Sequence, residues 1–242
     1  MTNQLVLLPG WGLERQVLQP LLDELQSLLP NFNLQLHPLP NPLGKCPKVI
    51  IQQLDKELPQ DSWLVGWSLG GMLATALAAQ RQTACAGVIS YASNACFLAN
   101  KHWPNALDTN TFDAFYQLCQ EDLAKGLNRF SLLSSQGAEE ARLLAKKLPA
   151  MVLVENNATA LAGLNLLASL DNRSAITDFT GRQLHLLATQ DVLVPSKVAS
   201  DLQALNPLAR VALLGQSHAS PIVEPRLLAK HLAAFILDKS NA

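Results

Sequence analysis

Residues 66–71 are Gly-Trp-Ser-Leu-Gly-Gly, and this stretch decides the fold. It follows an apolar run, residues 62–65, that predicts a strand, and it leads into an alanine- and leucine-rich segment, residues 71–80, that predicts a helix. A Gly-x-Ser-x-Gly sequence between a strand and a helix is typical of a nucleophile elbow. Because the turn is tight, the serine takes a strained backbone conformation, and the glycines let neighbouring backbone pass close by. We expect Ser68 to project its hydroxyl at the carboxyl edge of a sheet.

Strands and helices alternate on both sides of this motif. Such alternation predicts a parallel sheet with helices on both faces, which is the α/β class. Before and after the motif, strands are predicted at 5–8, 32–37 and 86–91, and helices at 18–29 and 49–58. Near the end of the chain, strands are predicted at 184–188 and 211–214, and helices at 197–205 and 226–237.

The alternation stops between residues 100 and 174, where only helices are predicted. Apolar side chains at 112, 115, 116 and 119 share one face of a helix, and further helices are predicted at 123–130, 138–148 and 159–170. We therefore expect an α/β-hydrolase-type core formed by residues 1–99 and 175–242. Residues 100–174 would form a helical cap inserted into this core.

Composition excludes several classes of protein. Of the 242 residues 49% are hydrophobic and 15% are charged, which does not fit a disordered chain. A net charge of −1 argues against nucleic acid as the main partner. No apolar run is long enough to span a membrane, and the run at 5–8 is too short for a signal peptide. Four scattered cysteines favour free thiols in a reducing cytoplasm, and nothing demands more than a monomer.

A serine hydroxyl needs a base to become a nucleophile, and five histidines are candidates. In an elbow-type hydrolase the chain order is serine, acid, histidine, which excludes His37 and makes His102 too early. His185 lies inside a predicted strand and His231 inside the last helix, so core or surface roles are expected for them. His218 follows a predicted strand in a Gly-Gln-Ser-His-Ala loop, at the same sheet edge as the elbow.

The acid is expected after the preceding strand. Asp191 stands there, in the loop that follows residues 184–188. Its carboxylate could accept the Nδ1 proton of His218 and stabilise the imidazolium. Asp178 precedes the strand and Asp201 falls on a helix, so both are weaker candidates.

Two backbone amides are expected to stabilise an oxyanion. One belongs to Leu69, the residue after the nucleophile. The other is expected from the Pro-Gly-Trp-Gly loop at 9–12, where Trp11 would donate its N–H. Each such hydrogen bond is worth roughly 3 kcal/mol in a transition state.

Several stretches together resemble the pimeloyl-[acyl-carrier protein] methyl ester esterases of biotin synthesis, a family of the α/β-hydrolase superfamily. They are Leu-Leu-Pro-Gly-Trp-Gly at 7–12, the elbow at 66–71, Ala-Ser-Asn-Ala-Cys-Phe at 92–97, Asp-Val-Leu-Val-Pro at 191–195 and Ser-His-Ala at 217–219. The resemblance runs along almost the whole chain. Pro9 stands where many members carry histidine, which leaves the Trp11 amide in place.

The resemblance implies hydrolysis of the methyl ester on a pimeloyl chain held by acyl-carrier protein, with methanol as the other product and without a metal or organic cofactor. It assigns Ser68, Asp191 and His218 to the triad, and Trp11 and Leu69 to the substrate oxygen. The family's substrate-contacting segment resembles Phe130, Ser131, Leu132, Leu133 and Ser134. Trp67 is a further candidate for lining the passage of the methylene chain.

Two basic pairs mark the cap. Lys125 and Arg129, like Arg142 and Lys146, are four residues apart and share a helix face. These positions resemble the carrier-facing basic residues of the family, and a basic face could steer an acidic carrier protein. Basic residues at this spacing also commonly serve only to solvate a helix, and the two interpretations stay open.

The sequence therefore predicts a cytoplasmic serine carboxylesterase. A general short-chain carboxylesterase without carrier specificity is the first alternative. An acyltransferase or a carbon–carbon hydrolase on the same fold is the second, since fold does not fix function. A non-catalytic ligand-binding protein is the third.

Overall fold

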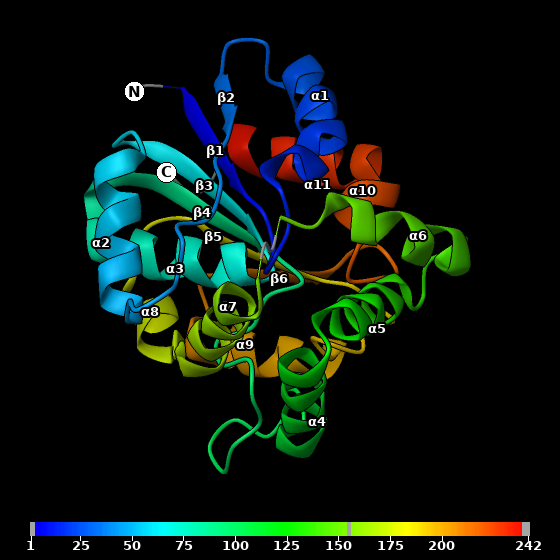
Figure 1. Cartoon of the computed structure of the whole chain (residues 1–242). Coiled ribbons are helices and arrows are strands. Elements are labelled where there is room, and N and C mark those ends of the chain that lie inside the picture. Colours follow the sequence, from blue (N-terminus) through cyan, green and yellow to red (C-terminus); the bar gives the residue numbers. More distant parts are fainter. Residues whose placement is uncertain (1–2, 154–155, 239–242) are drawn as a thin grey trace.

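The computed structural model describes residues 3–153 and 156–238 (Figure 1). Its centre is a six-stranded sheet in the order β2-β1-β3-β4-β5-β6, with every neighbouring pair parallel. This confirms the predicted α/β class. The strands are β1 (Gln4–Leu8), β2 (Asn33–Leu36), β3 (Ser62–Trp67), β4 (Cys85–Tyr91), β5 (Gln183–Leu187) and β6 (Arg210–Leu213). Every residue of β3 is buried, as expected for a strand covered on both faces.

Helices cover both faces of the sheet (Figure 1). On one face α1 (Gln19–Leu28) packs against α11 (Pro225–Leu237), with the short α10 (Ser220–Val223) beside them. On the other face lie α2 (Pro47–Glu57), α3 (Leu69–Arg81), α8 (Arg173–Asp178) and α9 (Ala199–Leu205). Short 3₁₀ turns are η1 (Arg15–Leu18), η2 (Gln82–Ala84), η3 (Leu148–Met151) and η4 (Ser196–Val198). Within the described ranges, no helix is long and apolar enough to cross a bilayer.

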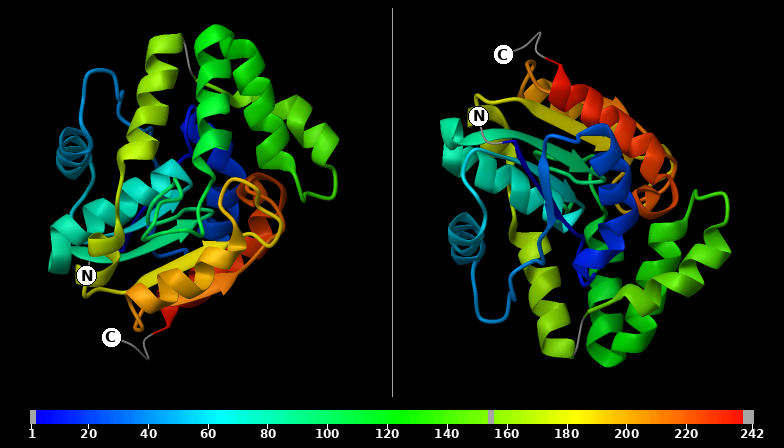
Figure 2. Two further views of the ribbon diagram at one scale, coloured as in Figure 1. Left: turned by 90° about the horizontal axis from the view of Figure 1, so that it is seen from below. Right: turned by 90° about the horizontal axis from the view of Figure 1, so that it is seen from above.

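The remaining helices gather on one side of the core, as Figure 2 shows. They are α4 (Thr109–Glu121), α5 (Leu123–Ser135), α6 (Ala141–Lys147) and α7 (Asn157–Ser169). Three of them start at a polar side chain that accepts a backbone N–H: Asp108 for α4, Asp122 for α5 and Asn156 for α7. Helix α4 packs on α5 and α7, and α5 packs on α6, so the four helices form one layer. We call this layer the cap.

One boundary differs from the sequence interpretation. The division drawn between residues 174 and 175 falls inside α8, a six-residue helix too short to show an apolar period. Because α8 packs on α3 and α9, a boundary just before Arg173 fits the packing better. Residues 1–2 and 239–242 of the core range, and 154–155 of the cap range, lie outside the described residues.

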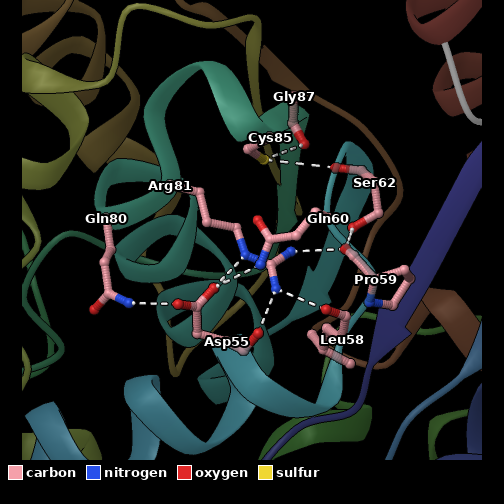
Figure 3. Close-up of polar contacts among 9 residues, drawn as sticks. All are labelled: Asp55, Leu58, Pro59, Gln60, Ser62, Gln80, Arg81, Cys85 and Gly87. Carbon is pink, nitrogen blue, oxygen red and sulfur yellow. Dashed lines mark hydrogen bonds and ion pairs between the residues drawn. The ribbon is translucent and has the colours of Figure 1, made fainter.

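A buried arginine fixes the far end of α3, the helix that begins after Ser68 (Figure 3). Arg81 Nε donates to Asp55 Oδ1 at 2.7 Å, and its Nη atoms donate to the carbonyls of Asp55, Leu58 and Pro59 at 2.8–3.0 Å. The hydrogen bond from Arg81 lowers the pKa of the Asp55 carboxyl. These bonds join the end of α3 to the end of α2, so α3 is anchored at the end opposite Ser68.

Candidate active site

Ser68 occupies a strained turn between β3 and α3. Its φ is 55° and its ψ is −119°, a left-handed backbone that non-glycine residues rarely adopt. The Ser68 N–H donates to the carbonyl of Tyr91 on β4 at 2.9 Å, which holds the turn against the sheet. A Cβ atom on Gly66 would lie 2.2 Å from the carbonyl oxygen of Gly70, and one on Gly70 would lie 2.3 Å from that of Pro9. The elbow therefore needs glycine at both positions because backbone passes through the space of a side chain.

His218 and Asp191 form a buried hydrogen-bonded pair. His218 Nδ1 lies 2.8 Å from Asp191 Oδ2, and the two side chains are 1% and 0% exposed. The other carboxylate oxygen, Oδ1, accepts the backbone N–H groups of Leu193 and Val194 at 2.8 and 3.0 Å. A carboxylate on Nδ1 fixes the tautomer with hydrogen there, which leaves Nε2 as an acceptor. Among the described residues, Nε2 is buried and has no hydrogen-bond partner.

The nucleophile and the pair lie at one edge of the sheet. Ser68 follows β3, Asp191 follows β5 and His218 follows β6, all at the carboxyl ends of parallel strands. The indole Nε1 of Trp67 donates to the carbonyl of His218 at 2.8 Å, which ties the elbow to the histidine loop. No hydrogen bond joins Ser68 Oγ to His218 Nε2 in the described part of the chain. Catalytic hydrogen bonds are often long before substrate binds, so the arrangement suits base activation of a serine.

The two residues expected to carry the oxyanion donors line a common cavity. Trp11 and Leu69 both line a cavity of about 260 Å³, together with Gly10 and Gly12. Across residues 3–153 and 156–238, neither backbone N–H donates a hydrogen bond to the protein. Leu69 is the first residue of α3, where the helix dipole adds partial positive charge. The two amides are therefore available to an incoming negatively charged oxygen.

A second, apolar cavity of about 50 Å³ adjoins Ser68 under the cap. Of the described residues that line it, Thr111 and Ser68 carry hydroxyl groups and none carries a charged side chain. The others are Trp11, Phe97, Leu107, Phe115, Phe130, Leu133, Leu164, Leu167, Val192 and Leu193. An uncharged aliphatic chain would bury its methylene groups here, at about 0.8 kcal/mol each.

The predicted contact segment divides into two faces. Phe130 and Leu133 line the apolar cavity. Ser131 donates its hydroxyl to the Leu127 carbonyl inside its own helix, and the carbonyl of Ser134 accepts the N–H of Ala219, next to His218. Leu132 differs from the expectation, because its side chain is 55% exposed on the outer surface of α5. At helical spacing, residue 132 lies on the face opposite the residues that point inward.

The four basic residues lie on the outer surface of the cap. Lys125 and Arg129 are exposed on α5, and Arg142 and Lys146 are exposed on α6. Lys125, Arg129 and Leu132 share one face of α5 by helical spacing, and α6 packs on α5. Lys125 also forms an exposed ion pair with Asp122 at 3.2 Å. The Asp122 carboxylate therefore offsets part of the positive charge of Lys125 at the start of α5.

A serine and a histidine are hydrogen-bonded in the core, away from the sheet edge. Ser90 Oγ on β4 lies 2.7 Å from His185 Nδ1 on β5, and Gln183 Oε1 lies 3.3 Å from His185 Nε2. Burial lowers the pKa of His185 to about 4, so the ring stays neutral. Both residues lie inside paired strands rather than at the sheet edge, and both imidazole nitrogens have partners. This confirms a core role for His185.

The other candidates from the sequence have different surroundings. Trp67, expected along the acyl passage, is 2% exposed and turns instead toward the histidine loop. Asp201 accepts a hydrogen bond from Asn105 at 2.8 Å. His37 Nδ1 lies 2.7 Å from the Pro38 carbonyl. Exposed positions are occupied by Asp178, His102 and His231.

Comparisons with known proteins agree with this architecture. The family model of the alpha/beta hydrolase fold matches residues 48–225. The crystal structure of a bromoperoxidase from Bacillus anthracis matches with a TM-score of 0.84 over 98% of this chain and 93% of that one, at 16% identity. An esterase from Exiguobacterium antarcticum also gives 0.84, over 98% and 92%, at 14% identity. Fold and site thus define an α/β hydrolase.

Sequence relatives narrow the family. A protein of Vibrio campbellii named pimeloyl-[acyl-carrier protein] methyl ester esterase is 33% identical over 232 residues, which are 90% of this chain and 88% of the relative. The biotin biosynthesis bifunctional protein BioHC of Cellvibrio japonicus is 36% identical over 239 residues, 96% of this chain. That match covers 47% of the relative, so this chain spans about half its length. The chain belongs to the pimeloyl-[acyl-carrier protein] methyl ester esterase family of the α/β hydrolases.

Proposed function

We propose that this chain is a serine carboxylesterase that converts pimeloyl-[acyl-carrier protein] methyl ester to pimeloyl-[acyl-carrier protein] and methanol, in biotin synthesis. The observation that carries the proposal is the buried Asp191–His218 pair with its free Nε2, at the sheet edge that also bears Ser68 in a strained turn. The names of the sequence relatives supply the substrate.

In the proposed reaction His218 Nε2 takes the proton of the Ser68 hydroxyl as Oγ attacks the ester carbonyl. The carbonyl oxygen becomes negative and accepts hydrogen bonds from the amides of Trp11 and Leu69. The bond to the methoxy group breaks, and methanol leaves with the proton from His218. Water then loses a proton to His218 and attacks the acyl-enzyme. The carboxyl product departs, and Ser68 regains its proton.

The apolar cavity supports an aliphatic acyl group. Phe130 and Leu133 of the cap and Leu193 of the core line it beside Ser68. A charged group placed there would lose its hydration without a partner. The cavity therefore suits the neutral methylene chain of a methyl pimeloyl group.

Carrier protein would approach the outer face of the cap. Lys125, Arg129, Arg142 and Lys146 are exposed there and would attract an acidic surface. The alternative is a general short-chain esterase, for which these charges only solvate the cap. The observation behind that alternative is the acidic Asp122, which pairs with Lys125 at 3.2 Å.

The proposal also includes a place of action. Four free cysteines, three of them buried, suit a reducing cytoplasm, and the protein would act there as a monomer.

The direct test is incubation of the purified protein with methyl-pimeloyl carrier protein. The expected result is equimolar methanol and a carrier whose mass has fallen by one CH₂ unit, with no product formed by Ser68→Ala. Transfer of the acyl group to an added amine or alcohol without net hydrolysis would instead favour an acyltransferase. If the carrier keeps its methyl ester while simple esters are cleaved, the result would favour the general esterase.

A further inference from the structure

Two aromatic side chains at the ends of β3 and β4 connect the nucleophile to the histidine loop. Trp67 and Tyr91 are register partners in the parallel ladder between these strands. Paired positions in a ladder point to the same face of the sheet. Both side chains are buried, at 2% and 3% exposure, and both line a small cavity with Pro221 of α10. They therefore form one aromatic pair under the loop that carries His218.

Each aromatic side chain donates to a main-chain carbonyl of that loop. Trp67 Nε1 donates to the carbonyl of His218 at 2.8 Å. The Tyr91 hydroxyl lies 3.0 Å from the carbonyl oxygen of Leu214 and 3.1 Å from that of Ser217, so it can share its hydrogen between them. Two consecutive carbonyls, of residues 217 and 218, are thus held from the sheet. The Ser217 carbonyl also accepts the N–H and the hydroxyl of Ser220, the first residue of α10, at 3.1 and 2.9 Å.

The loop is shaped around the tyrosine hydroxyl. Gly215 has a φ of 74°, and a Cβ atom there would lie 2.8 Å from the Tyr91 hydroxyl oxygen. Ser220 Oγ closes the same turn by accepting the N–H groups of Gln216 and Ser217 at 3.2 and 3.1 Å. Burial raises the pKa of Tyr91, so the hydroxyl keeps the hydrogen that it donates. The turn before His218 therefore depends on a phenol at this position.

The same two residues also hold Ser68. Trp67 is its covalent neighbour, and the main-chain carbonyl of Tyr91 accepts the Ser68 N–H at 2.9 Å. The backbone of each aromatic residue thus contacts Ser68, and the side chain of each donates a hydrogen bond to the loop that carries His218. Since Ser68 and His218 share no hydrogen bond here, these contacts set their separation.

We infer that Trp67 and Tyr91 are positioning residues that hold the His218 imidazole in register with the Ser68 hydroxyl. The inference rests on the proposed hydrolysis at Ser68. Neither side chain touches the substrate cavity beside Ser68, so their removal acts on the chemical step and not on substrate binding. Misplacing reacting groups by an ångström can cost about a hundredfold in rate.

The variants Tyr91→Phe and Trp67→Phe test this on dimethyl pimelate, a soluble methyl ester. Tyr91→Phe deletes one oxygen atom and should lower kcat about tenfold with KM within about twofold. Trp67→Phe should lower kcat more, because it removes the bond to His218 itself. The rate at which a fluorophosphonate labels Ser68 should fall in parallel, since that reaction needs the same base.

Matched controls separate positioning from folding. Tyr116→Phe removes a tyrosine hydroxyl that bonds Asn165 on the cap, and Trp103→Phe removes a buried indole N–H that bonds Asn94. Both should keep kcat within about twofold, whatever their change in Tm. If Tyr91→Phe keeps kcat, or raises KM and leaves kcat alone, the inference is overturned. If wild type cleaves neither dimethyl pimelate nor methyl-pimeloyl carrier protein, or if Ser68→Ala stays active, the proposed function fails first, which is a distinguishable result.

Discussion

The indole Nε1 of Trp11 donates to the carbonyl oxygen of Ala160 at 3.1 Å, and this bond joins the expected oxyanion loop to α7 of the cap. The Trp11 ring also meets Phe115 and Phe130 edge to face, with centroids 5.8 and 5.1 Å apart. It lines both cavities at the site, so it forms the wall between them. The position of the Trp11 backbone amide therefore depends on how the Trp11 side chain packs against three cap helices, α4, α5 and α7.

Gly163→Ala should disturb the packing of the Trp11 side chain against α7. A Cβ atom at residue 163 would lie 2.7 Å from Trp11 Cδ1 and 2.8 Å from Nε1, so the ring or α7 must shift. The preference of alanine over glycine in a helix, about 1 kcal/mol, offsets part of the cost of this shift, and kcat/KM on dimethyl pimelate should fall about tenfold. Asn165→Ala, on the exposed side of the same helix, serves as the control. Equal activity of Gly163→Ala and Asn165→Ala would show that the packing of the Trp11 side chain does not affect activity.

Acid should destabilise the protein through His185. The folded ring has a pKa of about 4, against about 6.5 for an unperturbed histidine, so between these pH values the unfolded chain binds a proton that the folded chain does not. Stability therefore falls as pH drops from about 6.5 to 4, by about 3 kcal/mol in all. Urea unfolding across this range should give a shallower pH dependence for His185→Gln. His231→Gln, at an exposed position, should keep the wild-type slope, and an unchanged slope in His185→Gln would contradict the account.

Charge reversal on the cap distinguishes a carrier-specific enzyme from a general esterase. Arg129→Glu combined with Arg142→Glu should raise KM for methyl-pimeloyl carrier protein about tenfold and leave dimethyl pimelate unaffected. The effect should shrink with added salt because exposed charges are screened. Lys48→Glu with Lys56→Glu, exposed on α2, is the matched control. Equal loss on both substrates, or no loss on either, would remove the docking role.

The sequence was sufficient for the parallel sheet and for the Asp191–His218 pair. Buried strands give continuous apolar runs, and residues directly after parallel strands meet at one edge, so chain order alone placed an acid beside a histidine. These inferences needed only local pattern and a topology with few alternatives. Phe130, which the family resemblance offers as a substrate contact, lines the apolar cavity.

Other features depend on contacts that no local pattern encodes. The Tyr91 hydroxyl lies within a turn more than 120 residues away, and its strand pattern predicts only burial. Trp67 was a candidate for lining the acyl passage, yet its indole donates to the His218 carbonyl instead. Leu132 lies between two inward-facing neighbours in sequence, and the helix turns it outward. Each case is decided by orientation rather than by residue type.

The central claim is that Ser68 and His218 act as one unit, and a double-variant comparison tests it most directly. Turnover of methyl-pimeloyl carrier protein would be measured for Ser68→Ala, His218→Ala and the double variant. The account predicts that each single change lowers kcat by about 10⁵-fold or more, and that the double variant is no slower than either. Losses that multiply in the double variant, or a Ser68→Ala enzyme that keeps more than a hundredth of its turnover, on the order of 3 kcal/mol of lost catalysis, would contradict it.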